Sequence, residues 1–177
     1  MTYDAAFYQE EGRVARVSAR IVLPRILEET AARSVIDLGC GTGEWVVAAQ
    51  EFGCAAMGVD RDVPGDLTLP DTYIDHNLTG GYPCGGFDLA LCLEVAEHLP
   101  EEAAGPLVEG LSHATAVLFS AATPGQPGIN HINCQPHDYW HDLFAGHGLT
   151  PTFVGDWFAD PVADFYRRNL YLYRRGA

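Results

Sequence analysis

A glycine-rich segment is the first part of this sequence whose residue types suggest chemistry. Residues 34–43 read SVIDLGCGTG, in which an apolar run ends in Asp37 and the glycines Gly39, Gly41 and Gly43 follow. Closely spaced glycines allow a sharp turn and let the backbone approach a ligand. The segment therefore predicts a ligand-binding turn between a strand and a helix.

The residues around this turn indicate the class of ligand. The dinucleotide pattern G-x-G-x-x-G is not completed, because Glu44 follows Gly43, and the lysine of a phosphate loop is absent. Acids flank the turn on both sides, and a carboxylate is favourable beside a cation rather than beside a phosphate. Asp60 ends the next apolar run, where a carboxylate accepts hydrogen bonds from ribose hydroxyls. We expect a ligand with an adenosine-like body and a positive end; the alternative is that the glycines only make a tight turn.

A second group of reactive side chains occurs in the stretch EVAEH, which contains Glu94, Glu97 and His98. At i, i+3 and i+4 they would share one side of a helix start. Three interpretations stay open: a divalent metal site, His98 as the general base for a substrate hydroxyl, or acids that favour a helix N-terminus next to a packing histidine. The candidate catalytic residues are Glu94, His98 and, from the later polar loop, His131. No other cluster faces these residues on sequence grounds, so we predict that the protein works without a bound metal.

A long polar stretch, residues 123–136, reads TPGQPGINHINCQP and follows the last predicted central strand. Long loops at the ligand-binding edge of a sheet are usually functional. We expect His131, with Asn130 and Asn133, to face a substrate; the alternative is a polar surface loop. Cys134 is not favoured as a nucleophile, since no feature of the sequence lowers its pKa.

The elements that would position these groups alternate between strands and helices. Helices are expected at 14–31 (with Pro24 as a kink or break), 43–52, 94–113 and 137–147. Strands are expected at 34–38, 55–60, 72–75, 87–93 and 115–121, and within 150–158 and 169–175. This order predicts an α/β fold: a doubly wound, mostly parallel sheet of about seven strands with helices on both faces. Ligands of such sheets bind beyond the carboxyl ends of the strands.

Composition limits the partners and the compartment. The chain has 177 residues, the size of one domain, and a formal net charge of −14, which disfavours sustained contact with nucleic acid or an anionic membrane. Five cysteines without a CxxC pair are typical of reduced thiols. The polar, acidic N-terminus does not resemble a signal peptide, and no apolar run reaches membrane-spanning length. We expect a cytoplasmic monomer or homodimer.

Taken together, VIDLGCGTG, the later GVD and FDLALCLEVAEHLP resemble the class I S-adenosylmethionine-dependent methyltransferases over roughly residues 33–122. The flanking stretches YDAAFY, LFSAATPGQPGINHIN and QPHDYW are similar to a bacterial subgroup of small stand-alone members. The resemblance implies a Rossmann-like fold, with S-adenosylmethionine as cofactor and S-adenosylhomocysteine as product.

The resemblance also implies roles for individual residues. Asp37 would face the cationic methionine end, Asp60 would hold the ribose, and either Asp75 or Asn77 would meet the adenine amino group. The implied cofactor-binding set is Asp37, Gly39, Cys40, Gly41, Asp60, Arg61, Asp75, Asn77 and, under the sulfonium, Cys92 and Leu93.

Three functions are compatible with this fold and ligand. The first is methyl transfer to a small molecule, in bacterial secondary metabolism. The alternative is hydrolysis or elimination on S-adenosylmethionine, or on a sulfonium nucleoside derived from it, without methyl transfer. A third class is a non-catalytic ligand sensor.

The chain divides into residues 1–32, an N-terminal helical cap, and residues 33–177, the cofactor-binding part of a single domain. Tyr3, Phe7 and Tyr8 are aromatic groups that a solvated tail has little use for. We expect them to fold over the ligand as a lid, with His131 on the opposite wall; the alternative is that they pack the first helix onto the sheet.

Overall fold

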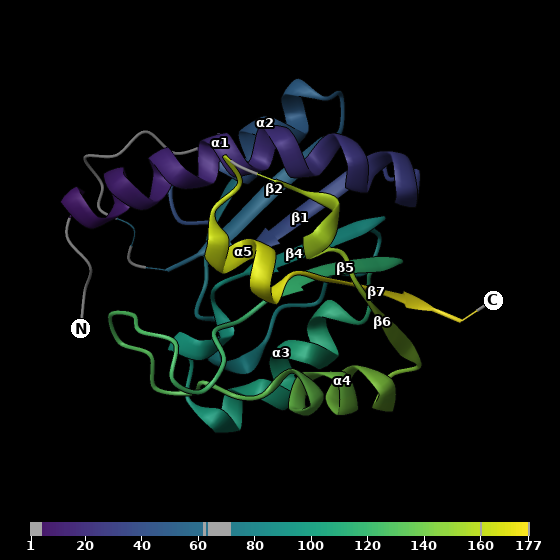
Figure 1. The fold of residues 1–177 in the computed structure, drawn as a ribbon. Coiled ribbons are helices and arrows are strands. Elements are labelled where there is room, and N and C mark those ends of the chain that lie inside the picture. The colour runs from purple at the N-terminus through teal and green to yellow at the C-terminus, as the bar shows by residue number, and fades with distance from the viewer. Residues whose placement is uncertain (1–4, 62, 64–71, 160, 177) are drawn as a thin grey trace.

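A single twisted sheet organises the molecule. The computed structural model describes residues 5–61, 63, 72–159 and 161–176, and side chains from residue 11 onward. Within these residues, seven strands lie in the order β3-β2-β1-β4-β5-β7-β6. The strands from β3 to β5 are parallel to their neighbours, whereas β7 is antiparallel to both β5 and β6. Figure 1 shows helices on both faces, which confirms the predicted Rossmann-like fold class.

The elements have the following bounds. The strands are β1 (Ser34–Leu38), β2 (Ala55–Asp60), β3 (Tyr73–Asp75), β4 (Leu89–Leu93), β5 (Ala116–Ser120), β6 (Leu149–Phe153) and β7 (Tyr171–Arg175). The α-helices are α1 (Ala5–Thr30), α2 (Glu44–Glu51), α3 (Ala104–Leu111), α4 (His137–Gly146) and α5 (Asp164–Asn169). Short 3₁₀ turns are η1 (Leu78–Gly80), η2 (Ala96–His98), η3 (Glu101–Ala103) and η4 (Gly155–Trp157).

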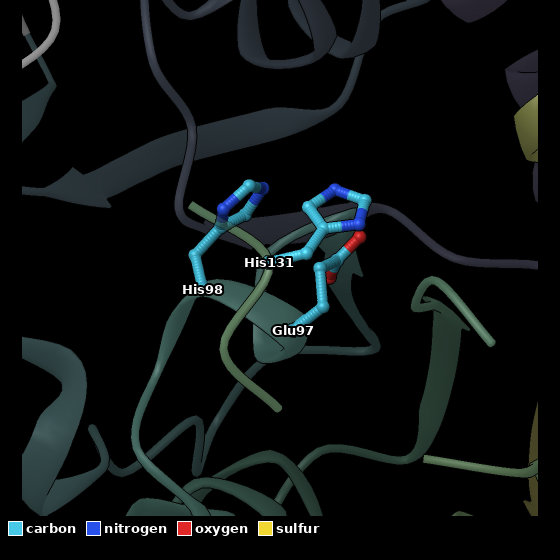
Figure 2. Close-up of side chains that lie close together, drawn as sticks. All are labelled: Glu97, His98 and His131. Atoms are coloured by element: carbon cyan, nitrogen blue, oxygen red, sulfur yellow. The ribbon is translucent and has the colours of Figure 1, made fainter. Parts of the chain in front are cut away.

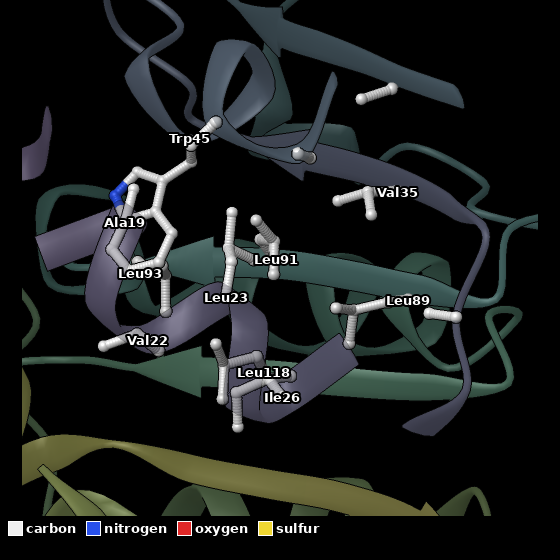
Figure 3. Close-up of a cluster of buried hydrophobic side chains, with 14 of the residues drawn as sticks. Ala19, Val22, Leu23, Ile26, Val35, Trp45, Leu89, Leu91, Leu93 and Leu118 are labelled. Carbon is white, nitrogen blue, oxygen red and sulfur yellow. The ribbon is translucent and has the colours of Figure 1, made fainter. Parts of the chain in front are cut away.

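Alternation along the central strands builds two cores. In β4, Leu89, Leu91 and Leu93 pack on the side of α1, α2 and α5, while Ala90 and Cys92 pack on the side of α3 and α4. Both faces of this strand are covered, so all five residues are apolar and buried. Figure 3 shows the first core, where leucines of the sheet meet a row of α1 side chains: Ala19, Val22, Leu23 and Ile26.

The segment after β4 differs from the helix expected at 94–113. It makes two 3₁₀ turns, and α3 begins only at Ala104. Gly105 and Pro106 therefore lie in the first turn of α3, where the missing N–H of proline costs nothing. They mark the start of the helix, so residues 94–103 are available for a non-helical turn at the end of the sheet.

Two further differences concern helices. Helix α1 continues through Pro24 without ending, because Val22, Leu23 and Ile26 on either side of it are fully buried against the sheet. Packing of this face outweighs the lost backbone hydrogen bond. Helix α5 was not expected from the sequence. None of the helices in the described part of the chain is both long and apolar enough to span a membrane.

Candidate active site

A cavity of about 840 Å³ lies at the carboxyl ends of the parallel strands. The turns after β1, β2 and β4 line it, together with η1, part of the 123–136 loop, α1 and α5. In Figure 1 this is the end of the sheet to which the arrows of β1 and β2 point, between the N-terminal half of α1 and the green loop before α4. The predicted location of the ligand site therefore coincides with the cavity.

The glycine turn has a conformation that requires glycine. Gly39 has φ 80°, and its amide donates to the carbonyl of Val59 at 2.7 Å. A Cβ on Gly39 would lie 2.3 Å from Cγ2 of Val95. Gly43, with φ 81°, precedes the first residue of α2. The turn is thus locked between β2 and the segment after β4, with its backbone against the cavity.

Asp60 ends β2 and fixes the rim of the glycine turn. Its carboxylate accepts hydrogen bonds from the amides of Gly41 and Arg61, each at 2.6 Å. Burial raises the pKa of Asp60, while these two amide bonds act in the opposite direction. Each carboxylate oxygen has more than one lone-pair site, so one amide bond leaves acceptor capacity for a ligand hydroxyl.

Asp37 is the next-to-last residue of β1, and its buried carboxyl group lines the cavity. Its side chain is 2% exposed, and Oδ2 has no hydrogen-bond partner among the described residues. Burial raises the pKa of Asp37 to about 8, and the nearby charge of Asp60 adds to the shift. A cation in the cavity would stabilise the ionised form, which fits the predicted positive end of the ligand.

The second acid that flanks the glycine turn has a different partner. Glu44 receives two hydrogen bonds from the Arg16 guanidinium of α1, at 2.7 and 3.0 Å. Arg20 makes a similar pair with Glu51 at the end of α2. The argument from two flanking acids therefore holds only for Asp37, since the Glu44 charge is neutralised by α1. These ion pairs tie α1 to α2 beside the cavity.

The remaining predicted cofactor residues divide into two groups. Cys40, Leu93 and Asn77 line the cavity, and the Asn77 side chain also accepts a hydrogen bond from the amide of Thr79. Cys92 points into the opposite core, because successive residues of a strand face opposite sides. Its predicted position under the sulfonium is corrected on this ground.

Two other predicted positions lie at the rim. Arg61 lines the cavity and is exposed. Asp75 is exposed at the end of β3 and is not among the residues that line the cavity. Of the two alternatives for the adenine amino group, the structure therefore favours Asn77.

On the far wall, Glu94 and Glu97 do not share a helix face as predicted. Glu94 has φ 55°, an unusual backbone conformation for a non-glycine residue. Its carboxylate accepts hydrogen bonds from Gln126 at 3.3 Å and from Asn169 at 3.4 Å. Oε1 of Glu97 accepts from the amide of Ala122 at 3.1 Å. Burial and the nearby charge of Glu94 raise the pKa of Glu97 to about 8.

The two predicted histidines face each other across the same wall. The ring centroids of His98 and His131 are 5.0 Å apart, and both residues line the cavity. Nδ1 of His98 lies 3.3 Å from the carbonyl of Asn130, and Nδ1 of His131 lies 3.2 Å from the carbonyl of Gln126. Burial and the neighbouring His131 lower the pKa of His98.

The two predicted asparagines have different positions. Asn130 lines the cavity. Asn133 is buried outside it; its Nδ2 donates to the carbonyl of Ala96, and its backbone amide donates to the carbonyl of Glu97. Asn133 thus anchors the loop instead of facing a substrate, which corrects its predicted role.

The predicted lid lies outside the part of the chain that the structure describes. Tyr3 lies outside the described residues, as do the side chains of Phe7 and Tyr8. The next described turn of α1 does reach the site, since Glu11, Gly12 and Ala15 line the cavity.

Sequence reasoning missed an aromatic part of the cavity wall. Trp45 of α2 and Tyr166 of α5 meet edge to face with ring centroids 5.5 Å apart, and Phe165 lines the cavity beside them. Trp45 lies two residues after Gly43 and could have been inferred from its place beside the glycine turn. The α5 aromatics gave no local signal, because they reach the site only after the chain has crossed to β6 and turned back.

Comparisons with known proteins agree with this geometry. A family model described as a methyltransferase domain matches residues 8–106. A ubiquinone biosynthesis O-methyltransferase of Methylococcus capsulatus is 31% identical over 84 residues, which are 41% of this chain and 35% of that protein. The chain thus spans about a third of the curated relative that it matches.

Solved structures share the fold at low sequence identity. A sugar N-methyltransferase from Streptoalloteichus is similar with a TM-score of 0.68 at 16% identity, covering 99% of this chain and 96% of that one. DesVI of Streptomyces venezuelae gives a TM-score of 0.71 at 14% identity, covering 99% and 100%. With more than half of its residues matched by the family model, the chain belongs to the methyltransferase domain family, within the class I S-adenosylmethionine-dependent methyltransferases.

Proposed function

We propose that the protein transfers the methyl group of S-adenosylmethionine to a small molecule and releases S-adenosylhomocysteine. One observation carries the proposal: the buried Asp37 carboxyl group lies beside the glycine turn and Asp60, on one wall of a cavity whose other wall holds histidine and glutamate side chains. The cavity volume of about 840 Å³ falls within the range of small-molecule sites.

The geometry supports a different role for each wall of the cavity: one would bind the cofactor and the other would position the acceptor. Asp60 has acceptor capacity left for the ribose, and Asp37 would stabilise the cationic end of the cofactor. Methyl transfer from a sulfonium is an in-line displacement, so the enzyme mainly has to position the acceptor against the methyl group. Glu94, His98 and His131, the predicted catalytic residues, line the wall where the acceptor would lie.

The acceptor that we propose is a small molecule of bacterial secondary metabolism. The net charge of −14 disfavours nucleic acid as a substrate, and the similar folds include a sugar N-methyltransferase. At the mouth of the cavity Ile129 and Ile132 are 61% and 65% exposed, which suits an acceptor with an apolar part.

We further propose that the protein acts in the cytoplasm, as a monomer or homodimer.

Product analysis by mass spectrometry tests the reaction. The protein is incubated with S-adenosylmethionine and fractionated bacterial extract, and the variant Gly39→Ala serves as the control that should not bind cofactor. S-adenosylhomocysteine together with a methylated product supports transfer. Methylthioadenosine would instead indicate hydrolysis or elimination, and tight binding without turnover would indicate a sensor.

We also propose that Tyr3, Phe7 and Tyr8 form a lid opposite His131, since the following turn of α1 lines the cavity. Removal of residues 1–10 should then reduce turnover and ligand affinity and leave the melting temperature without ligand almost unchanged. If the segment only packs the first helix, the melting temperature falls instead. Full activity of the truncated protein would rule out the lid.

A further inference from the structure

Three side chains from two separate segments converge on the far wall of the cavity. Glu97 and His98 belong to η2, and His131 belongs to the loop before α4. A carboxylate oxygen of Glu97 and one ring nitrogen from each histidine all lie within 4.8 Å of one another. Figure 2 shows both rings and the carboxylate on the same side of η2.

Backbone hydrogen bonds hold the two segments in this arrangement. The amides of Ile132 and Asn133 both donate to the carbonyl of Glu97, at 2.9 and 3.0 Å. The loop residue next to His131 is therefore attached to the turn that carries the other two groups. The backbone therefore keeps the two segments side by side, and the edge-to-face contact of the two histidine rings adds to this arrangement.

Each histidine also has the orientation that a metal ligand needs. The carbonyl of Asn130 lies 3.3 Å from Nδ1 of His98, and the carbonyl of Gln126 lies 3.2 Å from Nδ1 of His131. A carbonyl oxygen can only accept, so the tautomer with the proton on Nδ1 satisfies both contacts and leaves the lone pair of Nε2 for a ligand. Sγ of Cys134 also lies 3.6 Å from Nδ1 of His131. A carbonyl partner at the second nitrogen is the usual support of a metal-bound imidazole.

The Glu97 carboxylate supplies an independent indication of a missing partner. Its side chain is fully buried, and Oε2 has no hydrogen-bond partner among the described residues, although Oε1 accepts from the amide of Ala122. The neighbouring Glu94 carboxyl group can hydrogen-bond to Glu97 only while one of the two acids keeps its proton. A buried carboxyl oxygen that receives no bond from an N–H or O–H elsewhere is unfavourable, and a bound cation could take the place of that proton. A cation between Glu97 and the two rings would complete its coordination.

We propose that Glu97, His98 and His131 bind one divalent transition-metal ion. Two imidazoles and one carboxylate suit ions of the series from manganese to zinc, whereas magnesium and calcium prefer oxygen ligands throughout. Three protein ligands leave coordination positions open, and all three residues line the same cavity as Asp37 and Asp60. An oxygen or nitrogen of the acceptor can take an open position, so the ion would both orient the acceptor and favour its deprotonated form.

The sequence had predicted a protein without metal, because nothing appeared to face the EVAEH cluster. The structure supplies the facing group, His131, while Glu94 contacts Glu97, Gln126 and Asn169 and is not part of the three-residue group. Ion binding does not depend on the proposed methyl transfer; only the role of the ion toward the acceptor rests on that function.

Metal titration of the chelator-treated protein tests the site. Calorimetry with Zn²⁺, and electron paramagnetic resonance with Mn²⁺, should each report one ion per chain. Glu97→Gln and His131→Gln keep the side-chain size and should each weaken binding at least about tenfold, since one of three ligands is lost. His113→Gln removes an exposed histidine outside the cavity and should bind like the unmodified protein.

Circular dichroism of every variant checks that it is folded, and His131→Gln carries the test if the fully buried Glu97 does not tolerate change. Co²⁺ added to the unmodified protein should give visible absorption bands that His131→Gln loses. Equal affinity of the unmodified protein and the ligand variants, or binding of less than one ion, would overturn the site. Binding of S-adenosylmethionine is measured separately, so failure of the metal site and failure of the proposed function give different results.

Discussion

The two walls of the cavity are built in different ways. The cofactor wall comes from residues 37–60, where two adjacent parallel strands end. Backbone amides of the glycine turn donate to the Asp60 carboxylate and to the carbonyl of Val59. The acceptor wall joins η2 to a loop more than thirty residues later, through backbone bonds to the carbonyl of Glu97. The first wall is thus a rigid consequence of the sheet, whereas the second depends on a few bonds between distant segments.

This contrast has a functional consequence. A wall fixed by the sheet can serve one cofactor throughout a family, while a wall assembled from a long loop can change with the acceptor. We therefore expect substitutions on the cofactor wall to affect folding and cofactor binding together. Substitutions on the acceptor wall should affect the acceptor or the metal more than the fold.

The largest effect is expected at Gly39. Alanine there must adopt φ 80° and place its Cβ 2.3 Å from Val95, so Gly39→Ala should lower the free energy of unfolding by about 3–5 kcal/mol and abolish cofactor binding. Gly53→Ala is the matched control, because Gly53 has φ 83° but no atom within 4 Å of the added Cβ. It should cost only about 1 kcal/mol. Urea unfolding and calorimetry distinguish the two; similar losses in both would show that the glycine turn is not locked.

The second prediction concerns the pH dependence of stability. The pKa of Asp37 is raised to about 8 in the folded chain, so between about pH 4 and 8 the folded state keeps a proton that the unfolded state releases. Stability of the ligand-free protein is therefore lost as the pH rises through this window. Asp37→Asn has no such proton and should be more stable than the unmodified protein by about 2 kcal/mol near pH 5.5, with a difference that grows as the pH rises toward 8.

Thermal unfolding at a series of pH values measures this difference, and Asp88 provides a control of opposite sign. Backbone amides of Arg33 and Ser34 donate to Asp88, and the first of these bonds is the main cause of its lowered pKa. Asp88→Asn should therefore lose stability above pH 4. Equal pH profiles for Asp37→Asn and the unmodified protein would contradict the buried-carboxyl account.

Asp60→Ala should have a smaller effect, which concerns cofactor binding. It removes the carboxylate that accepts hydrogen bonds from the ribose hydroxyls and from two backbone amides, so calorimetry should show a cofactor affinity that is weaker by about 1–2 kcal/mol. Asp75→Ala removes an exposed carboxylate that does not line the cavity and should leave affinity unchanged. If Asp75→Ala lowered the cofactor affinity as much as Asp60→Ala, Asp75 would have to be counted among the cofactor-binding residues.

The sequence predicted the cofactor wall well and the rest of the cavity less well. The strands, the glycine turn, Asp37 and Asp60 were readable because their signals are local: apolar runs, bare backbone and acids at strand ends. The aromatic contribution of Phe165 and Tyr166 could not be predicted, because α5 has only six residues and reaches the cavity through tertiary contacts alone.

The segment after β4 shows why spacing misled. Carboxylates at i and i+3 with histidine at i+4 predict one helix face, yet Glu94 adopts φ 55° and the helix starts ten residues later. Helical spacing is a weak guide where the chain leaves a sheet, since hydrogen bonds to neighbouring strand ends compete with the first helical turn. The Glu94 amide, for example, donates to the carbonyl of Ser120.

The smallest effect is expected at Asn133, on the acceptor wall. Its side chain donates to the carbonyl of Ala96 and accepts from Gln135, but the two backbone bonds to Glu97 remain when it is truncated. Asn133→Ala should therefore lower the free energy of unfolding by only about 1 kcal/mol and leave cofactor affinity unchanged. Hydrogen exchange at the amides of Ile132 and Asn133 should become faster while that of the β1 amides does not, because the loop opens without the sheet. Faster exchange in both regions, or weaker cofactor binding, would show that the two walls are one cooperative unit and that the loop cannot vary independently of the cofactor site.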